Sequence, residues 1–280
     1  MSPRRSAGTR PDIALVISDV DGTLVTDDKR LTPATVAAVR RLGAAGIGFT
    51  LASSRPPVGL RGLVRDLGLA LPLGAFNGAC VVGPDLAVIE EHAIPEDAAR
   101  EAAHRLTGAG IDVWVFAAGA WWLRDAEGPY TDLERRTLQA EPRVRDDLAP
   151  LLGRAQKIVG VSRDHAHLAA CEAAVAEALG KRASVHRSQP YYLDVTPPGQ
   201  DKGAFVAWMG RHLGLAPERI ATFGDAANDR AMFARSGLSV AMGNAEDAVK
   251  AAASATTDSN ESDGFAGAVD RLILAAAPRP

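Results

Sequence analysis

A continuous apolar run at residues 13–17 and a mostly apolar run at residues 47–52 occur near the start of the chain. Runs of this length predict strands that are buried on both faces, as in a parallel sheet. Between them, Thr32 followed by Pro33 predicts the first turn of a helix, because threonine caps helices and proline suits the first helical position. A strand, a helix and a second strand in this order predict a βαβ unit.

The same pattern returns late in the chain. Asp201 can cap a helix that Gly214 would end, and residues 220–223 form another short apolar run. A further helix is predicted from about Asn228, and a further strand over residues 238–242. The outer parts of the chain therefore predict an α/β fold, with a Rossmann-like core domain built on a mostly parallel sheet.

Apolar and polar residues alternate in the middle of the chain. Ile111, Val113 and Val115 would lie on one face of a strand, with the intervening residues on the other face. Helical spacing is found at residues 96–106 and 165–179. This mixture predicts an α+β unit with a half-exposed antiparallel sheet, inserted into the first domain.

The change of pattern predicts where one unit interrupts the other. We expect a discontinuous core at residues 11–82 and 189–275, and an inserted α+β cap domain at residues 83–188. Residues 1–10 combine arginines with small and polar residues, and this composition predicts a flexible N-terminal tail.

Composition narrows the class of protein. Of 280 residues, 47% are hydrophobic and 23% charged, which is typical of a globular chain. The formal net charge of −3, without a basic stripe, argues against a nucleic-acid partner. No apolar run approaches the length of a membrane span, and the first one ends at Asp19. Cys80 and Cys171 show no metal-binding spacing and are expected to be reduced thiols. Together with the absence of a long apolar run, this predicts a cytoplasmic location.

Two carboxylates follow the first predicted strand directly. Asp19 and Asp21 are separated by one residue, and Gly22 allows a tight turn after them. In open α/β sheets, ligands bind outside the carboxyl ends of the strands. The two acids therefore indicate a functional site, although a solvated acidic turn would also account for them.

Phosphate-binding chemistry is suggested at two other positions. Ser53 and Arg55 end the second predicted strand, where hydroxyl, guanidinium and loop N–H groups can bind a phosphate oxygen. Lys202 begins a predicted helix, where a cation opposes the helix dipole, so a nearby phosphate would explain it better than helix propensity. Taken singly, a turn and a solvated surface lysine remain the simpler interpretations.

Acidic residues also follow the late strand. Asp225, Asn228 and Asp229 lie where the mouth of the sheet is expected. Oxygen ligands of this kind suit Mg²⁺, which is usually held by one or two carboxylates, water and substrate phosphate. Capping of the next helix is an alternative role for Asn228.

These motifs together resemble the haloacid dehalogenase superfamily, and within it the Cof-type sugar phosphatases. The run from Asp19 to Thr23 is similar to the first motif of that family, and residues 224–229 are similar to its Gly-Asp-x-x-Asn-Asp loop. Ser53 and Lys202 stand at the positions of its second-motif hydroxyl and its lysine. Ser54 departs from the family pattern, in which glycine is common.

The resemblance implies a soluble phosphatase that works through an aspartyl-phosphate intermediate. Asp19 would be the nucleophile and Asp21 the general acid and base. The remaining implied roles are phosphate binding by Ser53 and Lys202, Mg²⁺ binding by Asp19, Asp225 and the carbonyl group of Asp21, support of the metal site by Asp229, and substrate contact by Arg55 and Asn228. The expected substrate is a small phosphorylated metabolite, such as a sugar phosphate.

Two other functions fit the same motifs. A phosphotransferase of the phosphomannomutase kind would pass the phosphoryl group to a sugar hydroxyl instead of water. A non-catalytic, phosphosugar-binding regulator would keep the fold without the chemistry. The complete acid set argues against the regulator, because binding alone needs no general acid such as Asp21.

Overall fold

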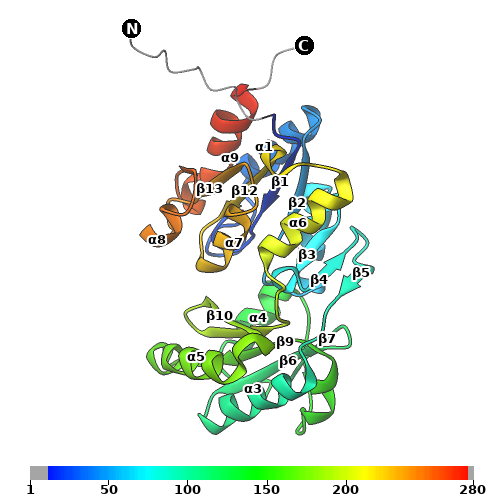
Figure 1. The fold of residues 1–280 in the computed structure, drawn as a ribbon, viewed down its shortest axis with the longest axis vertical. Helices are drawn as coiled ribbons and strands as arrows, with labels where there is room; N and C mark the ends of the chain where they lie inside the picture. Colours follow the sequence, from blue (N-terminus) through cyan, green and yellow to red (C-terminus); the bar gives the residue numbers. More distant parts are fainter. Residues whose placement is uncertain (1–11, 277–280) are drawn as a thin grey trace.

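The computed structural model describes residues 12–276, which form two lobes (Figure 1). The predicted tail at residues 1–10 lies outside the described residues. The upper lobe in the figure holds a five-stranded parallel sheet in the order β14-β13-β12-β1-β2. Its strands are β1 (Leu15–Ser18), β2 (Gly48–Leu51), β12 (Ile220–Gly224), β13 (Leu238–Ala241) and β14 (Ala255–Thr256). The predicted α/β fold with a parallel sheet is confirmed.

Helices cover the two faces of this sheet. They are α1 (Pro33–Ala44), α2 (Arg61–Leu67), α6 (Lys202–Leu213), α7 (Arg230–Phe233), α8 (Asp247–Lys250) and α9 (Gly264–Ala268). Successive side chains of a strand point to opposite faces. Val16 therefore packs with Leu42 of α1 in one core, whereas Ile17 packs with Phe205 of α6 in the other. This alternation explains why Leu15, Val16 and Ile17 of β1 are all apolar.

The two predicted helix starts are capped as expected. Thr32 accepts a hydrogen bond from the Thr35 N–H group at 3.1 Å, and Asp201 accepts one from the Ala204 N–H group at 2.7 Å. Each bond satisfies an N–H group that has no partner inside the helix. The cap at Asp201 fixes Lys202 as the first residue of α6.

The lower lobe is built on a six-stranded sheet in the order β10-β11-β9-β6-β7-β8. All neighbouring pairs are antiparallel except β7 and β8. Its strands are β6 (Asp112–Ala117), β7 (Ala120–Leu123), β8 (Arg143–Val144), β9 (Ala155–Val161), β10 (Ser184–Gln189) and β11 (Tyr192–Thr196). Helices α3 (Glu96–Gly108) and α5 (His165–Leu179) cover the outer face, and α4 (Thr131–Leu138) lies at the junction with the upper lobe (Figure 1).

The expectation of a half-exposed sheet is wrong. Trp114 and Phe116 face away from α3 and α5, yet their exposed fractions are only 2% and 3%. Both belong to the hydrophobic core that extends into the upper lobe, and the ring centroids of Phe116 and Phe76 are 5.5 Å apart. The sheet is buried on its second face because the upper lobe covers it.

A small antiparallel sheet joins the lobes. It consists of β3 (Leu73–Ala75), β4 (Cys80–Val82) and β5 (Val88–Glu91). The strand pairings extend past the expected boundaries at residues 83 and 189. Beyond residue 83, β5 continues the sheet of β3 and β4, and beyond residue 189, β11 pairs with β9 and β10. Among the described residues, none of the helices combines the length and the apolar character that crossing a membrane requires.

Candidate active site

The carboxyl ends of β1 and β12 bring the predicted acids together. Asp19 follows β1, and its backbone N–H group donates to the Phe223 carbonyl at 2.9 Å, so the two strand ends stay in register. Gly22 has a φ of +83°, and a Cβ atom there would lie 2.3 Å from Oδ2 of Asp225. Only glycine combines this conformation with so close an approach. The loop after β1 can therefore lie directly against the loop after β12.

Lys202 is buried at the centre of the acids. Its Nζ atom lies 2.5 Å from Oδ1 of Asp19 and 2.6 Å from Oδ1 of Asp229. The side chain is fully buried, so the solvated lysine that we considered from the sequence is excluded. Burial alone would lower the pKa of Lys202, but the two carboxylates raise it above its ordinary value, and the ammonium group stays charged.

Asp225 and Asp229 have different surroundings. Oδ2 of Asp229 accepts bonds from the N–H groups of Asp225 and Ala226 at 2.8 and 2.9 Å, and its Oδ1 accepts from Lys202. The Asp225 carboxylate accepts from the Thr23 hydroxyl at 2.8 Å. Oδ2 of Asp225 accepts only a longer bond of 3.4 Å from the Asn244 amide group, so Asp225 keeps more capacity for a ligand than Asp229, which fixes the loop.

Three carboxylates form a group that can hold a metal ion. Asp19, Asp225 and Asp229 each offer an oxygen, and these oxygens lie within 4.8 Å of one another. Burial, together with mutual repulsion, raises the pKa of Asp19 to about 6 and that of Asp225 to about 8. A divalent cation would relieve this repulsion, and an all-oxygen donor set suits Mg²⁺. The residues present therefore fit the expected ion.

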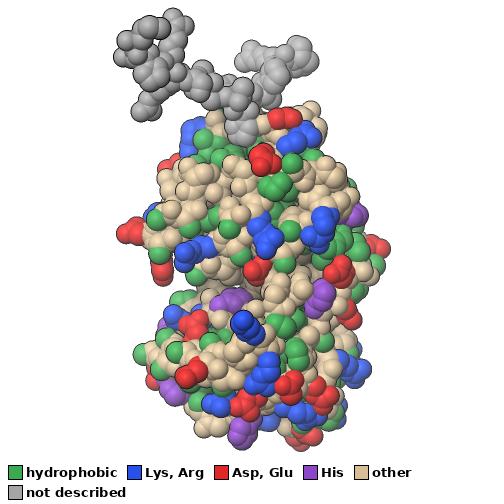
Figure 2. Space-filling view, in the orientation of Figure 1, with side chains coloured by type: hydrophobic (Ala, Val, Ile, Leu, Met, Phe, Trp, Pro, Cys, Tyr) green, Lys and Arg blue, Asp and Glu red, His purple; other side chains and the backbone are tan. Residues whose placement is uncertain are grey.

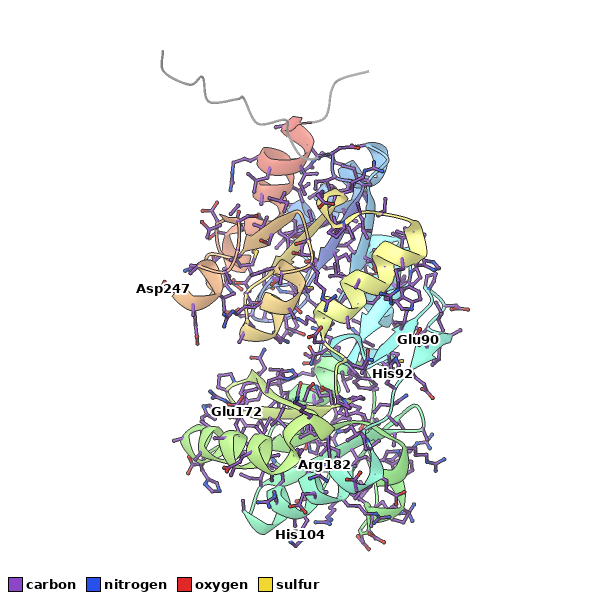
Figure 3. The ribbon with its side chains drawn as sticks, in the orientation of Figure 1. Glu90, His92, His104, Glu172, Arg182 and Asp247 are labelled. Atoms are coloured by element: carbon purple, nitrogen blue, oxygen red, sulfur yellow. The ribbon has the colours of Figure 1, made fainter. Side chains whose placement is uncertain are left out.

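No histidine or cysteine enters this group of described residues. His92 pairs with Glu90 on β5 at 2.9 Å, and His104 lies at the far end of the lower lobe (Figure 3). Softer metals favour imidazole and thiolate ligands. The donor set thus argues for a hard cation rather than zinc.

Asp21 is held by two cations. The Arg55 guanidinium donates to both of its carboxylate oxygens at 2.8 Å, and Nζ of Lys29 lies 2.9 Å from Oδ1. Burial would raise the pKa of Asp21, but Arg55 and Lys29 lower it below the ordinary range. Arg55, which the sequence suggested as a substrate contact, is thus bound to the second acid of the first motif in this structure.

Ser53 and Asn228 have polar partners outside the acidic cluster. The buried Ser53 hydroxyl accepts from the Arg55 N–H group at 3.1 Å, which orders the turn after β2. Asn228 donates to Oδ1 of Asn77 at 3.0 Å, and Asn77 in turn lies 3.0 Å from Nε2 of His186 in the lower lobe. No hydrogen bond to Asp19 is found for either residue within residues 12–276.

The lower lobe supplies the opposite wall of the cleft, which Figure 2 shows as a hollow between the lobes. A cavity of about 40 Å³ beside Asp21 is lined from that side by Glu134, Lys157 and Tyr191. Lys157 pairs with Asp194 at 2.7 Å and donates to the Ser54 carbonyl at 3.1 Å. Asp21 therefore faces side chains from α4, β9 and the end of β10 across this cavity.

Sequence reasoning missed several residues of this site. Lys29, Thr23 and Asn244 contact the acids, and Asn244 donates to the Gly22 carbonyl at 2.9 Å. Thr23, Asn77 and Asn244 stand in segments that resemble the family, without an assigned role, and Asn77 follows β3 in a Phe-Asn-Gly turn with a φ of +58°. The contact of Thr23 with Asp225 joins residues that are far apart in the chain, whereas Lys29 and Asp21 lie in the same loop after β1.

Comparisons with known proteins agree with this geometry. Residues 16–269 match the model of the haloacid dehalogenase-like hydrolases. The chain is 30% identical to an HMP-PP phosphatase of Enterobacter sp., over 82% of this chain and 84% of the relative. It is 26% identical to the 5-amino-6-(5-phospho-D-ribitylamino)uracil phosphatase YcsE of Bacillus subtilis, over 94% and 97% of the two chains.

A solved structure shows the same fold. A sugar phosphatase of subclass IIB of this superfamily is 23% identical, with a TM-score of 0.82 over 94% of this chain and 99% of the other. The match includes both lobes, because it spans nearly the whole of each chain. With the family model covering most of the sequence, the conclusion is that the chain belongs to the haloacid dehalogenase-like hydrolases and is a Cof-type phosphatase.

Proposed function

We propose that this phosphatase hydrolyses a small phosphomonoester, such as a sugar phosphate, through an aspartyl-phosphate on Asp19. The observation that carries the proposal is the buried contact of Asp19 with Lys202, beside Asp225 and two residues before Asp21. An ionised carboxylate is a ready nucleophile, and the adjacent ammonium group can stabilise the charge of a phosphoryl group. The relatives act on different phosphate esters, so their names indicate only the substrate class.

The first step is attack of an Asp19 oxygen on phosphorus while the ester P–O bond breaks. Asp21 gives its proton to the leaving alkoxide oxygen. In the second step Asp21 takes a proton from water, which attacks the phosphoryl group. Inorganic phosphate leaves, and the Asp19 carboxylate is restored. Ser53 and Lys202 are proposed to bind the phosphoryl oxygens during both steps.

The proposed cofactor is Mg²⁺, held by Asp19, Asp225 and the backbone carbonyl of Asp21. The ion would neutralise charge on the phosphate, so that an anionic nucleophile can approach. Asp229 would act indirectly, because its hydrogen bonds keep Lys202 and the loop after β12 in place.

Asp21 must release a cation before it can donate a proton. Its pKa is lowered by Arg55 and Lys29, so in this arrangement it stays ionised. A substrate phosphate offers Arg55 a competing anion of higher charge. We infer that the substrate draws Arg55 away from Asp21, which allows Asp21 to bind a proton and gives Arg55 its predicted contact with substrate. Asn228 is proposed to contact the substrate from the opposite side.

The lower lobe limits the size of the substrate. Both lobes line the cavity beside Asp21, so the ester must enter between them. We propose a small soluble metabolite rather than a folded phosphoprotein, with the lower lobe acting as a cap over it. The free cysteines of the described chain are compatible with the proposed cytoplasmic location.

A phosphate-release screen over phosphorylated metabolites, with Mg²⁺ and without an acceptor sugar, tests the function. Release from one or more small esters supports hydrolysis. Transfer only in the presence of a sugar acceptor would favour the phosphotransferase, and tight phosphosugar binding without turnover would favour the regulator. Efficient release from folded phosphoproteins alone would contradict the proposed substrate class.

A further inference from the structure

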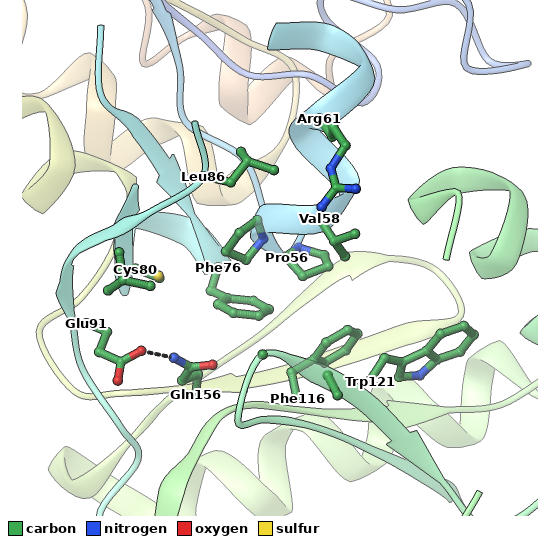
Figure 4. A pocket seen from close by; sticks show the side chains of 14 residues that line it. Pro56, Val58, Arg61, Phe76, Cys80, Leu86, Glu91, Phe116, Trp121 and Gln156 are labelled. Carbon is green, nitrogen blue, oxygen red and sulfur yellow. Dashed lines mark hydrogen bonds between the residues drawn. The ribbon is translucent and has the colours of Figure 1, made fainter. Parts of the chain in front are cut away.

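A second cavity, of about 240 Å³, lies where the upper lobe, the β3-β4-β5 sheet and the lower lobe meet. Figure 4 shows Pro56, Val58 and Leu86 on one side of it, and the rings of Phe116 and Trp121 on the other. The two rings are stacked, with centroids 6.4 Å apart and planes inclined by 11°. The walls therefore form a flat, largely apolar slot.

This cavity is separate from the acidic site. The residues that line it include neither Asp21 nor any other residue of the cavity beside Asp21. The turn after β2 divides the two spaces, because Arg55 bonds to Asp21 on one side while Pro56 and Pro57 line the second cavity. A ligand here would not occupy the place of the reacting phosphate.

Among the polar side chains that line the slot, one has no hydrogen-bonding partner. Gln156 donates to Glu91, so these two satisfy each other. Within the described chain, the Arg61 guanidinium makes no hydrogen bond or ion pair, whereas Arg65 on the same helix pairs with Asp66 at 2.8 Å. Arg61 is exposed at the rim of the cavity, so its guanidinium is available to a ligand that enters there.

The apolar walls of the slot and the positive charge of Arg61 together indicate a class of ligand. Stacked aromatic rings and prolines favour a flat apolar body, and a free guanidinium favours a carboxylate, which it can bind through two parallel hydrogen bonds. The volume is below the roughly 300–1,000 Å³ of typical small-molecule sites, so one or two fused rings would fill it. We propose that this cavity is a second ligand site, which binds a small aromatic carboxylate with its ring in the slot and its carboxylate on Arg61.

Such a ligand would touch both lobes at once. Val58 and Arg61 belong to the upper lobe, and Phe116 and Trp121 belong to the lower lobe. An occupant that contacts both parts stabilises the arrangement in which they meet. Binding should therefore affect opening of the cleft without competing for the acids, and this separates the site from an ordinary inhibitor of the phosphatase.

Calorimetric titration of the full chain with 2-naphthoate tests the site. We expect binding to the native chain, about tenfold or more weaker binding to Arg61→Gln, and unchanged binding to Arg65→Gln, since a charge-assisted hydrogen bond is lost only in the first variant. Neutral 2-naphthamide should bind the native chain as weakly as 2-naphthoate binds Arg61→Gln. Ala120→Trp, which places an indole in the slot, should abolish binding of both.

Three results would overturn the proposal. One is the absence of 2-naphthoate binding to the native chain at millimolar concentration. Another is equal affinity in the native chain and Arg61→Gln. The third is displacement of 2-naphthoate by inorganic phosphate, which would place the probe at the acidic site. Because the readout is binding, the proposal stands or falls separately from the phosphatase mechanism.

Discussion

The two sides of the cleft differ in how their charged groups are arranged. On the upper side, Asp19, Asp225 and Asp229 surround one buried lysine, and burial together with mutual repulsion raises the pKa values of the first two. On the lower side, Lys157 forms an ion pair with Asp194 at 2.7 Å, and the buried Glu134 accepts a hydrogen bond from the Tyr192 hydroxyl. The carboxylates of the upper wall thus repel one another, whereas the charged groups of the lower wall have partners.

The difference indicates separate roles: the upper wall carries out the reaction, and the lower wall fits the substrate. An excess of negative charge suits a site that binds a divalent cation, because the cation offsets that charge and can then attract a phosphate. A balanced wall provides shape and hydrogen bonds without attracting a second phosphate. The account therefore predicts that variants of the upper wall change reaction rates, whereas variants of the lower wall change stability or substrate preference.

The largest effect is expected at the nucleophile. Asp19→Asn should reduce phosphate release to background with every substrate, because an amide cannot form the phosphoenzyme. The variant should fold normally, since it removes repulsion from the acidic cluster. Asp270→Asn, at an exposed carboxylate that pairs with Arg41, is the matched control and should keep full activity. Substantial turnover by Asp19→Asn would remove this residue from the mechanism.

Removal of the metal should have an effect of similar size. A chelator should abolish phosphate release, and added Mg²⁺ should restore it, because the acids otherwise repel an anionic ester. Asp225→Ala should stay inactive at any Mg²⁺ concentration tested. Full activity of the native chain in chelator would contradict the role of the cluster.

Arg55→Gln tests the proposed exchange of partners. Loss of a charge-assisted contact with substrate should raise KM by about tenfold. Steady-state kinetics would measure the change, with Arg65→Gln as a control on the exposed surface of α2. An unchanged KM would mean that Arg55 serves Asp21 alone.

The smallest effect is expected on the lower wall. Burial raises the pKa of Glu134 to about 7, although Lys157 and the Tyr192 hydroxyl, which donates to it at 3.1 Å, lower it. The unfolded chain releases this proton near its ordinary pKa of about 4.3, so ionisation costs stability as the pH rises from there to about 7. Glu134→Gln should therefore stabilise the protein at pH 8 by on the order of 1 kcal/mol, and by little at pH 4.

Chemical unfolding at both pH values would measure this difference. Glu177→Gln, at an exposed position on α5, should change stability at neither pH. If Glu134→Gln destabilised the protein more at pH 8 than at pH 4, the pKa of Glu134 in the folded state would lie below its ordinary value, which would contradict the effect of burial that we infer.

The upper wall was more predictable than the lower wall. Strands that are apolar throughout predict a parallel sheet, and the ends of parallel strands lie at one edge, so residues after β1 and β12 could be expected to meet. Lys202 followed from the same reasoning, since its helix starts at that edge. The burial of Lys202 did not follow, because a lysine at a helix start is usually solvated.

The lower wall depends on contacts between lobes, which no local pattern encodes. Trp114 and Phe116 alternate with apolar residues in a way that fits an exposed face as well as a covered one, and only the packing on Phe76 decides between them. The bond of Arg55 to Asp21 likewise depends on tertiary structure, since it joins the loops that follow two neighbouring strands of the upper lobe. Contacts of this kind depend on tertiary packing and are found only in the folded chain.

The most direct test of the mechanism is rapid-quench mass spectrometry of Asp21→Asn with p-nitrophenyl phosphate. General acid–base catalysis is typically worth about 10²–10⁴-fold, but nitrophenolate needs little protonation to leave, so the first step should be partly rescued while hydrolysis of the intermediate stays slow. The account predicts that a phosphoryl group accumulates on Asp19. Absence of phosphoenzyme under these conditions, or a phosphoryl group on a serine or histidine, would contradict it.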